Sequence, residues 1–188
     1  MGNRKYLTAK EVGQLLSGAE KSRNPERNYC MILMAYRHGF RISELLSVTL
    51  SDIDMDSGII FIRRLKNGFS VAHPCTDEEY DSLKIWLRIR SHIPEGNNTD
   101  NIFISSSGRK ISRTQAWKII KQCGQDGGVP FHVHPHMLRH SCGYHLADKG
   151  TDTRLIQDYL GHRNIRHTVL YTKSNYKRFE SLWGTGSL

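Results

Sequence analysis

The amino-acid sequence predicts an α+β fold that is mainly α-helical, with one small antiparallel β-sheet. Two observations lead to this prediction. First, three polar pairs with a spacing of three residues stand directly before apolar segments of helical period, and such capping boxes mark helix starts. The pairs are Thr8 with Glu11, Thr76 with Glu79, and Ser112 with Gln115. Second, one stretch changes to a strand-like pattern around an Asn-Gly dipeptide, which is typical of a β-hairpin.

The first third of the chain is predicted to be helical. After the capping residue Thr8, the apolar side chains of residues 12–19 recur on one helical face. A second helix is predicted over residues 24–39, because Pro25 suits the first helical position and a glycine stands at its end. Residues 41–46 are predicted to form a short further helix.

The sheet is predicted in the middle of the chain. Two apolar segments, residues 59–62 and 69–72, flank Asn67-Gly68, which favours a tight turn of the type I′ kind. Residues 102–104, an Ile-Phe-Ile sequence, are predicted to add a short strand to this sheet.

The remaining segments carry helix signals. A helix is predicted from Thr76 to about Arg90, and another after Ser112. Pro135 and Gly150 bound the next helix, Thr151 is predicted to cap another that ends at Gly161, and residues 165–172 form the last.

The charge of the chain indicates a polyanionic partner. With 27 Lys and Arg against 18 Asp and Glu, the 188 residues carry a formal net charge of +9, and basic proteins bind phosphate backbones by releasing counterions. An anionic membrane surface is the alternative, but no stretch approaches the roughly 20 apolar residues of a membrane span.

The first residues lack the apolar core of a secretory signal. These features predict a cytoplasmic protein, whose scattered cysteines are free thiols rather than a disulfide set. They are Cys30, Cys75, Cys123 and Cys142.

Polar side chains concentrate in the C-terminal third. His136, Arg139 and His140 have helical spacings that place them on one side of a helix. Leu160-Gly161-His162 follows, and Tyr171 stands nine residues after that histidine.

Two basic residues upstream complete the set. Arg41 follows Gly39-Phe40, and Lys66 lies beside the Asn-Gly turn. Each residue alone has an ordinary explanation, since exposed arginines, edge-protecting lysines and packed tyrosines are common.

Together these residues resemble the tyrosine recombinases, the lambda-integrase family. The resemblance covers residues 7 to 175, and it rests on His136-x-x-Arg139-His140, on Leu160-Gly161-His162, on Tyr171 and on the string that begins Gly39-Phe40-Arg41-Ile42-Ser43-Glu44. The family's six functional positions are filled in the family's order. They are Arg41, Lys66, His136, Arg139, His162 and Tyr171.

The resemblance implies that DNA is cut by transesterification at phosphorus. Negative charge then builds on the five-coordinate phosphate, and catalysis consists mainly of positioning and charge stabilisation. Arg41 and Arg139 are expected to hold the two non-bridging oxygens, because the planar guanidinium donates two parallel bonds and stays charged. His162 is expected to add a third donor.

The resemblance also assigns the covalent step. Tyr171 is the expected nucleophile, His136 the expected acceptor of its proton, and Lys66 the expected acid for the leaving 5′ oxygen. The product is a 3′-phosphotyrosine that conserves the bond energy, so neither ATP, a metal nor any other cofactor is expected.

A metal site is the competing interpretation of the histidines. His132, His134 and His136 alternate and would face one way on an extended strand. Pro135 interrupts that strand, and no carboxylate or cysteine completes an obvious ligand set.

The chain also departs from the common family pattern. Members usually carry an additional N-terminal helical domain, but Arg41 lies so near the start that this domain is expected to be absent. Residues 1–175 are then the catalytic domain, and residues 176–188 are a tail that subunits exchange.

This layout, with Arg63-Arg64-Leu65-Lys66 and His73-Pro74, resembles the fimbrial phase-variation recombinases. The partners it implies are double-stranded DNA with inverted repeats, a tetramer on that DNA, and DNA-bending proteins.

Two other functions remain open at this point. One is a type IB topoisomerase that nicks and reseals DNA, and the other is a catalytically silent DNA-binding module. The complete set of six residues argues against the silent module. The mixed basic and apolar tail after Tyr171 favours recombination over simple nicking.

Overall fold

The computed structural model describes residues 4–64 and 70–173. It confirms a mainly helical fold with one small antiparallel sheet. The α-helices are α1 (Ala9–Glu20), α2 (Pro25–Arg37), α3 (Ile42–Leu45), α4 (Asp77–Arg90), α5 (Arg113–Asp126), α6 (Pro135–Asp148), α7 (Thr153–Leu160) and α8 (Arg166–Thr172). The strands are β1 (Ile53–Asp54), β2 (Ile59–Ile62) and β3 (Val71–Pro74), and 3-10 turns span Leu50–Asp52 and Gly96–Asn98.

The helix starts follow the local sequence. All three predicted capping boxes are present, at the first residues of α1, α4 and α5. One predicted cap is wrong, because α7 is capped by Asp152 and not by Thr151. The Asp152 carboxylate accepts from the backbone nitrogens of Arg154 and Leu155, and a charged acceptor beside the exposed N–H groups of a helix end is a strong cap.

The sheet differs from its prediction in one strand. Its order is β1-β2-β3, all antiparallel, with Ile60 opposite His73. Residues 102–104 do not form a strand, although their side chains are fully buried. Isolated bridges pair the flanking residue Asn101 with Thr49, and Ile104 with Lys110. The predicted turn at Asn67-Gly68 lies outside the described residues.

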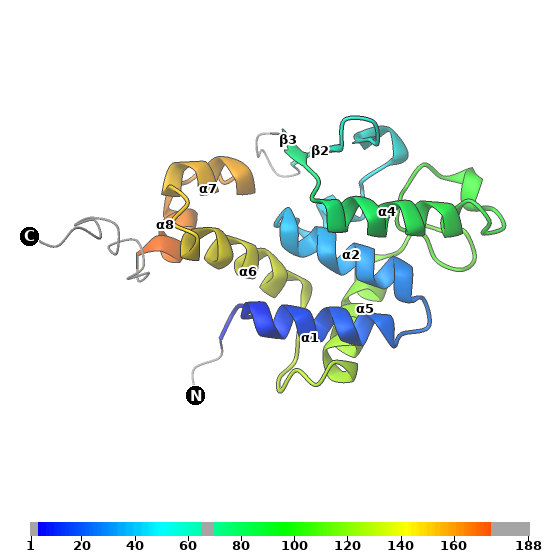
Figure 1. The fold of residues 1–188 in the computed structure, drawn as a ribbon, viewed down its shortest axis with the longest axis horizontal. Coiled ribbons are helices and arrows are strands. Elements are labelled where there is room, and N and C mark those ends of the chain that lie inside the picture. Colours follow the sequence, from blue (N-terminus) through cyan, green and yellow to red (C-terminus); the bar gives the residue numbers. More distant parts are fainter. Residues whose placement is uncertain (1–3, 65–69, 174–188) are drawn as a thin grey trace, which may run out of the picture.

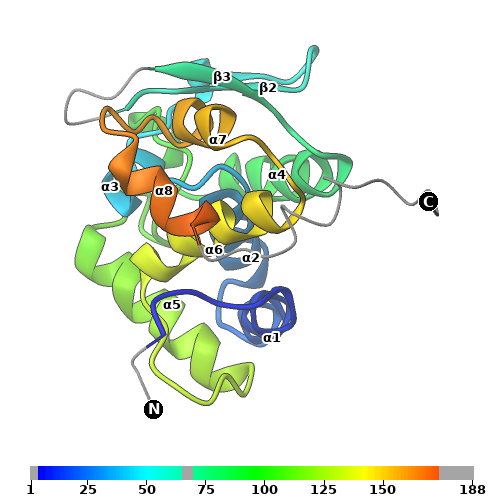
Figure 2. The same cartoon turned by 90° about the vertical axis from the view of Figure 1, so that its left-hand side faces the viewer.

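The core is built around α2. This helix packs against α1, α4, α5 and α6, and α1 also packs along α5 (Figure 1). A smaller apolar cluster lies where α6, α7 and α8 meet, and it includes Cys142, Leu160 and Tyr171. Figure 2 shows β2 and β3 at one edge of the molecule, with α7 and α8 between the sheet and α6. The nucleophile predicted from the sequence is therefore a core residue of this smaller cluster.

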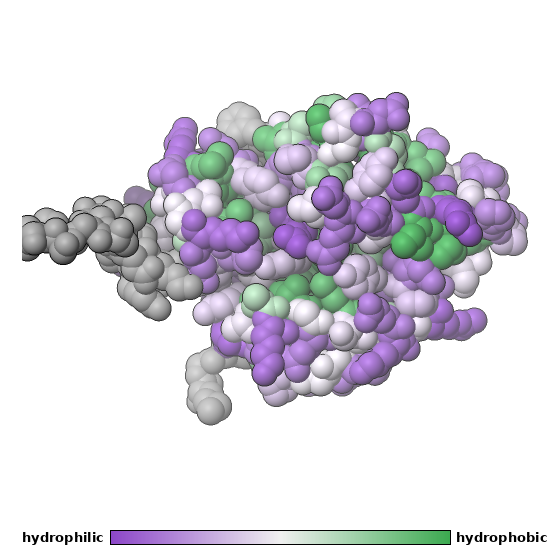
Figure 3. All heavy atoms as spheres, in the orientation of Figure 1, coloured by the Kyte–Doolittle hydropathy of each residue, from purple (hydrophilic) through white to green (hydrophobic). Residues whose placement is uncertain are grey.

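The surface is that of a polar protein. The face in Figure 3 is mostly hydrophilic, with apolar side chains gathered over part of α4, where Ile85 and Ile89 are exposed. None of the helices in the described part of the chain is long and apolar enough to cross a membrane. The four cysteines are free, and Cys75 is the one that is not fully buried.

Candidate active site

Two glycine-ended helices define the site. α2 and α7 are followed by Gly39 and Gly161, both in the left-handed region, with φ of 58° and 65°, where a residue without a Cβ is favoured. The space around these two glycines also excludes a side chain. A Cβ on Gly39 would lie 2.3 Å from a Leu160 methyl carbon, and one on Gly161 would lie 2.9 Å from the Arg64 side chain. The loop after α2 and the loop after α7 therefore touch.

Two buried arginines join these loops at matching positions. Arg139 donates to the carbonyl oxygens of Gly39 and Leu160, at 2.5 and 2.8 Å. Arg64 donates to the carbonyl oxygens one residue earlier in each loop. These are His38, at 3.3 Å, and Tyr159, at 2.7 Å. In each loop a predicted site residue stands two positions after the Arg139 contact, Arg41 after Gly39 and His162 after Leu160. The two arginines thus hold Arg41 and His162 in a fixed relation.

A buried carboxylate gathers the arginines. Glu44 is 0% exposed and lies 2.6 Å from Arg41, 3.0 Å from Arg64 and 3.9 Å from Arg139, measured between guanidinium nitrogens and carboxylate oxygens. Burial alone would raise the pKa of the Glu44 carboxyl, but the Arg41 hydrogen bonds and the charge of Arg64 outweigh it and the pKa is lowered. Three guanidinium groups around one carboxylate leave two positive charges in excess. Such a preorganised cationic cluster in a water-poor place suits a phosphate.

Tyr171 is held from one side by α6. Its side chain is 2% exposed, and a Cβ on Gly143 would come within 2.5 Å of its ring, so only a glycine fits beneath it. Its ring stacks near that of His162, with centroids 6.3 Å apart, and lies edge-on to Tyr144 at 5.1 Å. Burial raises the pKa of Tyr171 to about 12, and the charge of Arg139 acts in the opposite direction. The hydroxyl is therefore protonated at neutral pH.

Three histidines surround the tyrosine and the arginines. His140 Nδ1 lies 3.1 Å from the Tyr171 hydroxyl, and the ring of His136, one turn earlier on α6, is edge-on to that of His140 at 4.5 Å. His162 Nδ1 lies 2.9 Å from the hydroxyl of the fully buried Thr168. Burial and the nearby arginines lower the pKa of His162 to about 3, so its imidazole is neutral.

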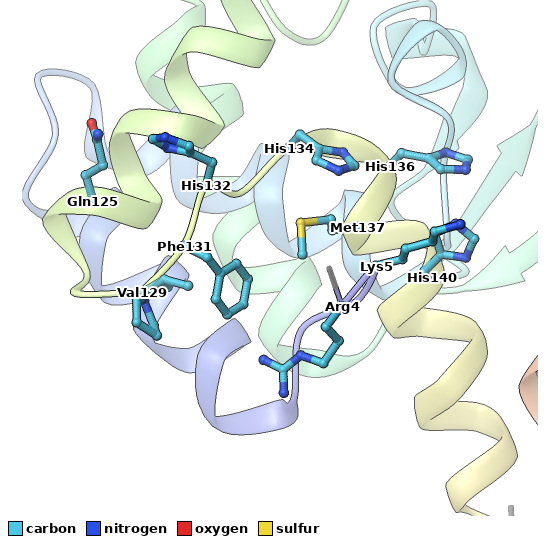
Figure 4. A pocket seen from close by; sticks show the side chains of 11 residues that line it. Arg4, Lys5, Gln125, Val129, Phe131, His132, His134, His136, Met137 and His140 are labelled. Atoms are coloured by element: carbon cyan, nitrogen blue, oxygen red, sulfur yellow. The ribbon is translucent and has the colours of Figure 1, made fainter. Parts of the chain in front are cut away.

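A cavity opens beside α6. It has a volume of about 1110 Å³, and it is lined mainly by basic and imidazole side chains (Figure 4). These are Arg4, Lys5, His132, His134, His136 and His140. Over residues 4–64 and 70–173 no three His, Cys, Asp or Glu side chains converge as metal ligands.

The structure brings five of the six predicted residues together. Arg41 and Arg139 share Glu44, His162 stacks near Tyr171, and His136 reaches the same tyrosine through His140. The sixth, Lys66, lies outside the described residues.

Two residues that matter here had no predicted role. His140 was part of the quoted motif, but nothing in the sequence showed that its ring meets the tyrosine hydroxyl. Arg64 was detectable in principle, because it continues the two-residue period of the buried residues Ile60 and Ile62.

The comparisons with known proteins agree with this geometry. The family model described as "Phage integrase family" matches residues 5–178. The chain is 52% identical over 188 residues to the type 1 fimbriae regulatory protein FimE of Escherichia coli (strain K12), covering all of this chain and 95% of the relative.

Solved structures extend the likeness to the fold. The crystal structure of XerA recombinase matches with a TM-score of 0.81 and 26% identity, over 95% of this chain and 63% of that one. The XerH site-specific recombinase bound to difH substrate, in a pre-cleavage complex, matches with a TM-score of 0.76 and 25% identity, over 90% of this chain and 50% of that one. The chain therefore belongs to the phage integrase family of tyrosine site-specific recombinases.

Proposed function

We propose that this protein cuts and rejoins double-stranded DNA through a 3′-phosphotyrosyl bond to Tyr171, and that it inverts a promoter segment in fimbrial phase variation. The observation that carries the chemistry is the arginine cluster on Glu44, fixed by the same two loops that hold His162 beside a buried tyrosine. The similarity to FimE supports the fimbrial role, and the difH substrate in the XerH complex, together with the DNA in a complex of the Tn1549 transposon integrase, supports the substrate.

Arg41, Arg139 and His162 can bind a phosphate because Arg41 is partly exposed and because the other two keep N–H groups that no acceptor in the described part of the chain uses. The Arg41 side chain is 30% exposed, so it can reach a phosphate from solvent. Arg139 uses one N–H of each terminal nitrogen on a carbonyl, and each nitrogen carries a second N–H. If the Thr168 hydroxyl donates to His162 Nδ1, the proton of the neutral imidazole lies on Nε2, which then donates to the phosphate. These three residues would hold the non-bridging oxygens.

The covalent step joins the Tyr171 oxygen to phosphorus and releases the 5′ oxygen of the DNA. The hydroxyl proton passes to one of two successive histidines of α6, His136 or His140, and the leaving oxygen takes a proton from Lys66. The positive charge around the phosphate compensates for the charge that develops in the transition state. Rejoining reverses the same steps, so the reaction consumes no ATP and needs no metal or other cofactor.

The assembly belongs to the same proposal. Residues 1–175 would act as the catalytic domain, and the tail at 176–188 would dock on a neighbouring subunit. Four subunits would then bind two inverted-repeat sites, with DNA-bending proteins shaping the segment between them. Acting on such a substrate, the protein would work in the bacterial cytoplasm, at the nucleoid.

The test is a cleavage assay on a nicked DNA substrate, performed in EDTA, followed by mapping of the covalent peptide. We expect an adduct on Tyr171 and none with Tyr171→Phe, while DNA binding by that variant stays near normal because only a hydroxyl is lost. An adduct on Tyr176, or cleavage that requires an added metal, would contradict the chemistry.

A plasmid with two sites separates the related functions. Inversion identifies a recombinase, relaxation without inversion a type IB topoisomerase, and binding without an adduct a silent module.

A further inference from the structure

We propose that His140, rather than its helical neighbour His136, takes the proton from the Tyr171 hydroxyl when DNA is cut and returns it when DNA is rejoined. This inference rests on the proposed function, and it assigns one further catalytic residue within it. The observation behind it is the 3.1 Å contact between His140 Nδ1 and the Tyr171 oxygen.

The position of the tyrosine leaves its hydroxyl little choice of acceptor. Tyr171 is 2% exposed, and its ring is wedged against Gly143, where even a methyl group would clash. Within the described residues, the hydrogen bond found for the hydroxyl is the one to His140. A general base must lie within about 2.6–3.2 Å of the proton donor, and His140 Nδ1 meets this condition before DNA is bound.

His136 occupies a different position. It precedes His140 by one helical turn, and its side chain is exposed, whereas His140 is half-buried. The ring of His136 meets the ring of His140 edge-on, and His140 in turn contacts the tyrosine hydroxyl. An exposed histidine beside Arg139 and Arg41 is placed to donate to a phosphate oxygen, and the proton acceptor is the residue behind it.

The protonation states before cleavage are suitable. Burial lowers the pKa of His140 to about 4, and the neighbouring charges act in the same direction, so at neutral pH the imidazole has a free lone pair. The titratable and charged groups around this pair are Lys5, Arg41, His134, His136, Arg139, Cys142, Tyr144 and His162. Because the pKa of Tyr171 is about 12, the proton stays on the tyrosine until attack begins.

The step balances. The Tyr171 oxygen forms its bond to phosphorus, its proton moves to His140 Nδ1, and the bond from phosphorus to the 5′ oxygen breaks with a proton supplied to that oxygen. The imidazolium that results lines the 1110 Å³ cavity, so its charge is hydrated from that side and lies close to the bound phosphate. Proton return during rejoining uses the same contact.

The first test separates the proton acceptor from the acid. His140→Asn keeps a polar side chain but cannot take a proton, so we expect adduct formation to slow by about 10²-fold or more. A substrate with sulfur in place of the 5′ bridging oxygen needs no acid, because a thiolate leaves readily. That substrate should restore Lys66→Ala and leave His140→Asn slow. Restoration of His140→Asn would assign the residue to the leaving group and overturn the proposal, as would cleavage of ordinary DNA within about threefold of wild type.

The second test uses chemical rescue and a matched control. His140→Ala opens space next to the cavity, so added imidazole should recover a substantial part of the lost rate. His145→Ala removes another histidine of α6, one that packs edge-on against Tyr36, and should cleave normally with no response to imidazole. A response of His136→Ala with none for His140→Ala would overturn the assignment.

The pH dependence gives an independent measure. Without the acceptor, cleavage depends on the small fraction of ionised Tyr171, so the rate of His140→Asn should rise about tenfold per pH unit between pH 7 and 9, more steeply than the wild-type rate. Equal slopes would contradict the role. The wild-type adduct on Tyr171 is the reference in every assay: its absence would refute the proposed function, whereas its presence with an unaffected His140→Asn would refute only this inference.

Discussion

Glu44 and Glu79 are both almost completely buried, yet they collect different basic side chains. Glu44 contacts three arginines. Glu79 caps α4 through Thr76, and its other oxygen lies 3.0 Å from Nε2 of His38. His38 in turn meets His73 through their Nδ1 atoms, 3.1 Å apart.

The two clusters meet at one residue. The carbonyl of His38 accepts from Arg64 in the first cluster, and its side chain belongs to the second. The contact between His38 and Glu79 is short, but Nε2 and Oε1 count among the buried atoms without an aligned hydrogen-bond partner in the described part of the chain. We therefore regard it as an electrostatic contact rather than a good hydrogen bond.

The two clusters differ in whether their basic side chains stay charged. Arginine remains protonated inside a protein, so the Glu44 cluster always carries excess positive charge and attracts an anion. Imidazole can be buried neutral, and burial together with the nearby His38 and Arg64 lowers the pKa of His73 to about 3. The Glu79 cluster thus joins β3, α2 and α4 without a large net charge, which suits a structural connection.

The largest expected effect tests the permanent charges of the first cluster. Arg41→Lys and Arg139→Lys keep the charge but lose the planar pair of donors. For each variant we expect adduct formation to fall on the order of 10³-fold, about 4 kcal/mol of transition-state stabilisation, as for the loss of an oxyanion donor. Single-turnover cleavage measures this, and near-normal cleavage by either variant would remove that arginine from the phosphate site.

The second prediction exchanges the two carboxylates for amides. Glu44→Gln leaves three buried or half-buried guanidinium groups without their counter-charge and should lower the free energy of unfolding by about 3 kcal/mol. Glu79→Gln can still accept from the Thr76 backbone, so its loss should be nearer 1 kcal/mol. Urea denaturation of both variants measures the difference, and equal losses would show that the clusters do not differ as described.

The sequence predicted the locally encoded parts of this arrangement. Thr76 and Glu79 cap a helix by contacts within four residues, and the two glycine stops are similarly local. The role of Arg64 was not predicted, because its acceptors His38 and Tyr159 come from distant segments. Residues 102–104 were wrongly assigned to the sheet because a short buried apolar run has the same composition whether or not it pairs along its length.

The third prediction compares adjacent arginines. Arg63 is 68% exposed and pairs with Asp52, whereas the Arg64 side chain is completely buried. Arg64→Met retains most of the side-chain volume but leaves the carbonyls of His38 and Tyr159 without this donor, which should cost about 2 kcal/mol of stability. Cleavage should also slow, because the loops that carry Arg41 and His162 lose one of their two bridges.

Arg63→Met is the matched control for that comparison. Arg63 is mostly exposed, and its buried partner Asp52 still accepts hydrogen bonds from Thr49, so the stability of Arg63→Met should stay within about 1 kcal/mol of wild type. An Arg64→Met variant that unfolds and cleaves like Arg63→Met would show that Arg139 alone holds the two loops.

The smallest effect concerns pH and the second cluster. In the folded protein the pKa of His73 is about 3, against an ordinary value of 6.5, so the unfolded chain binds a proton that the folded chain does not. The contribution of His73 to the free energy of unfolding is fully present above pH 6.5. It declines as the pH falls toward 3, by about 1.4 kcal/mol per pH unit. His162 should add to this decline in the same direction, because its folded pKa is also about 3. In a plot of unfolding free energy against pH, His73→Asn should therefore lower the slope between pH 6 and 4.5 by about the value that corresponds to one bound proton. This change in slope is independent of any effect of the substitution at neutral pH. Urea denaturation across this range tests it, with the exposed His92→Asn as the surface control, and an unchanged slope for His73→Asn would mean that the imidazole of the Glu79 cluster is not held neutral.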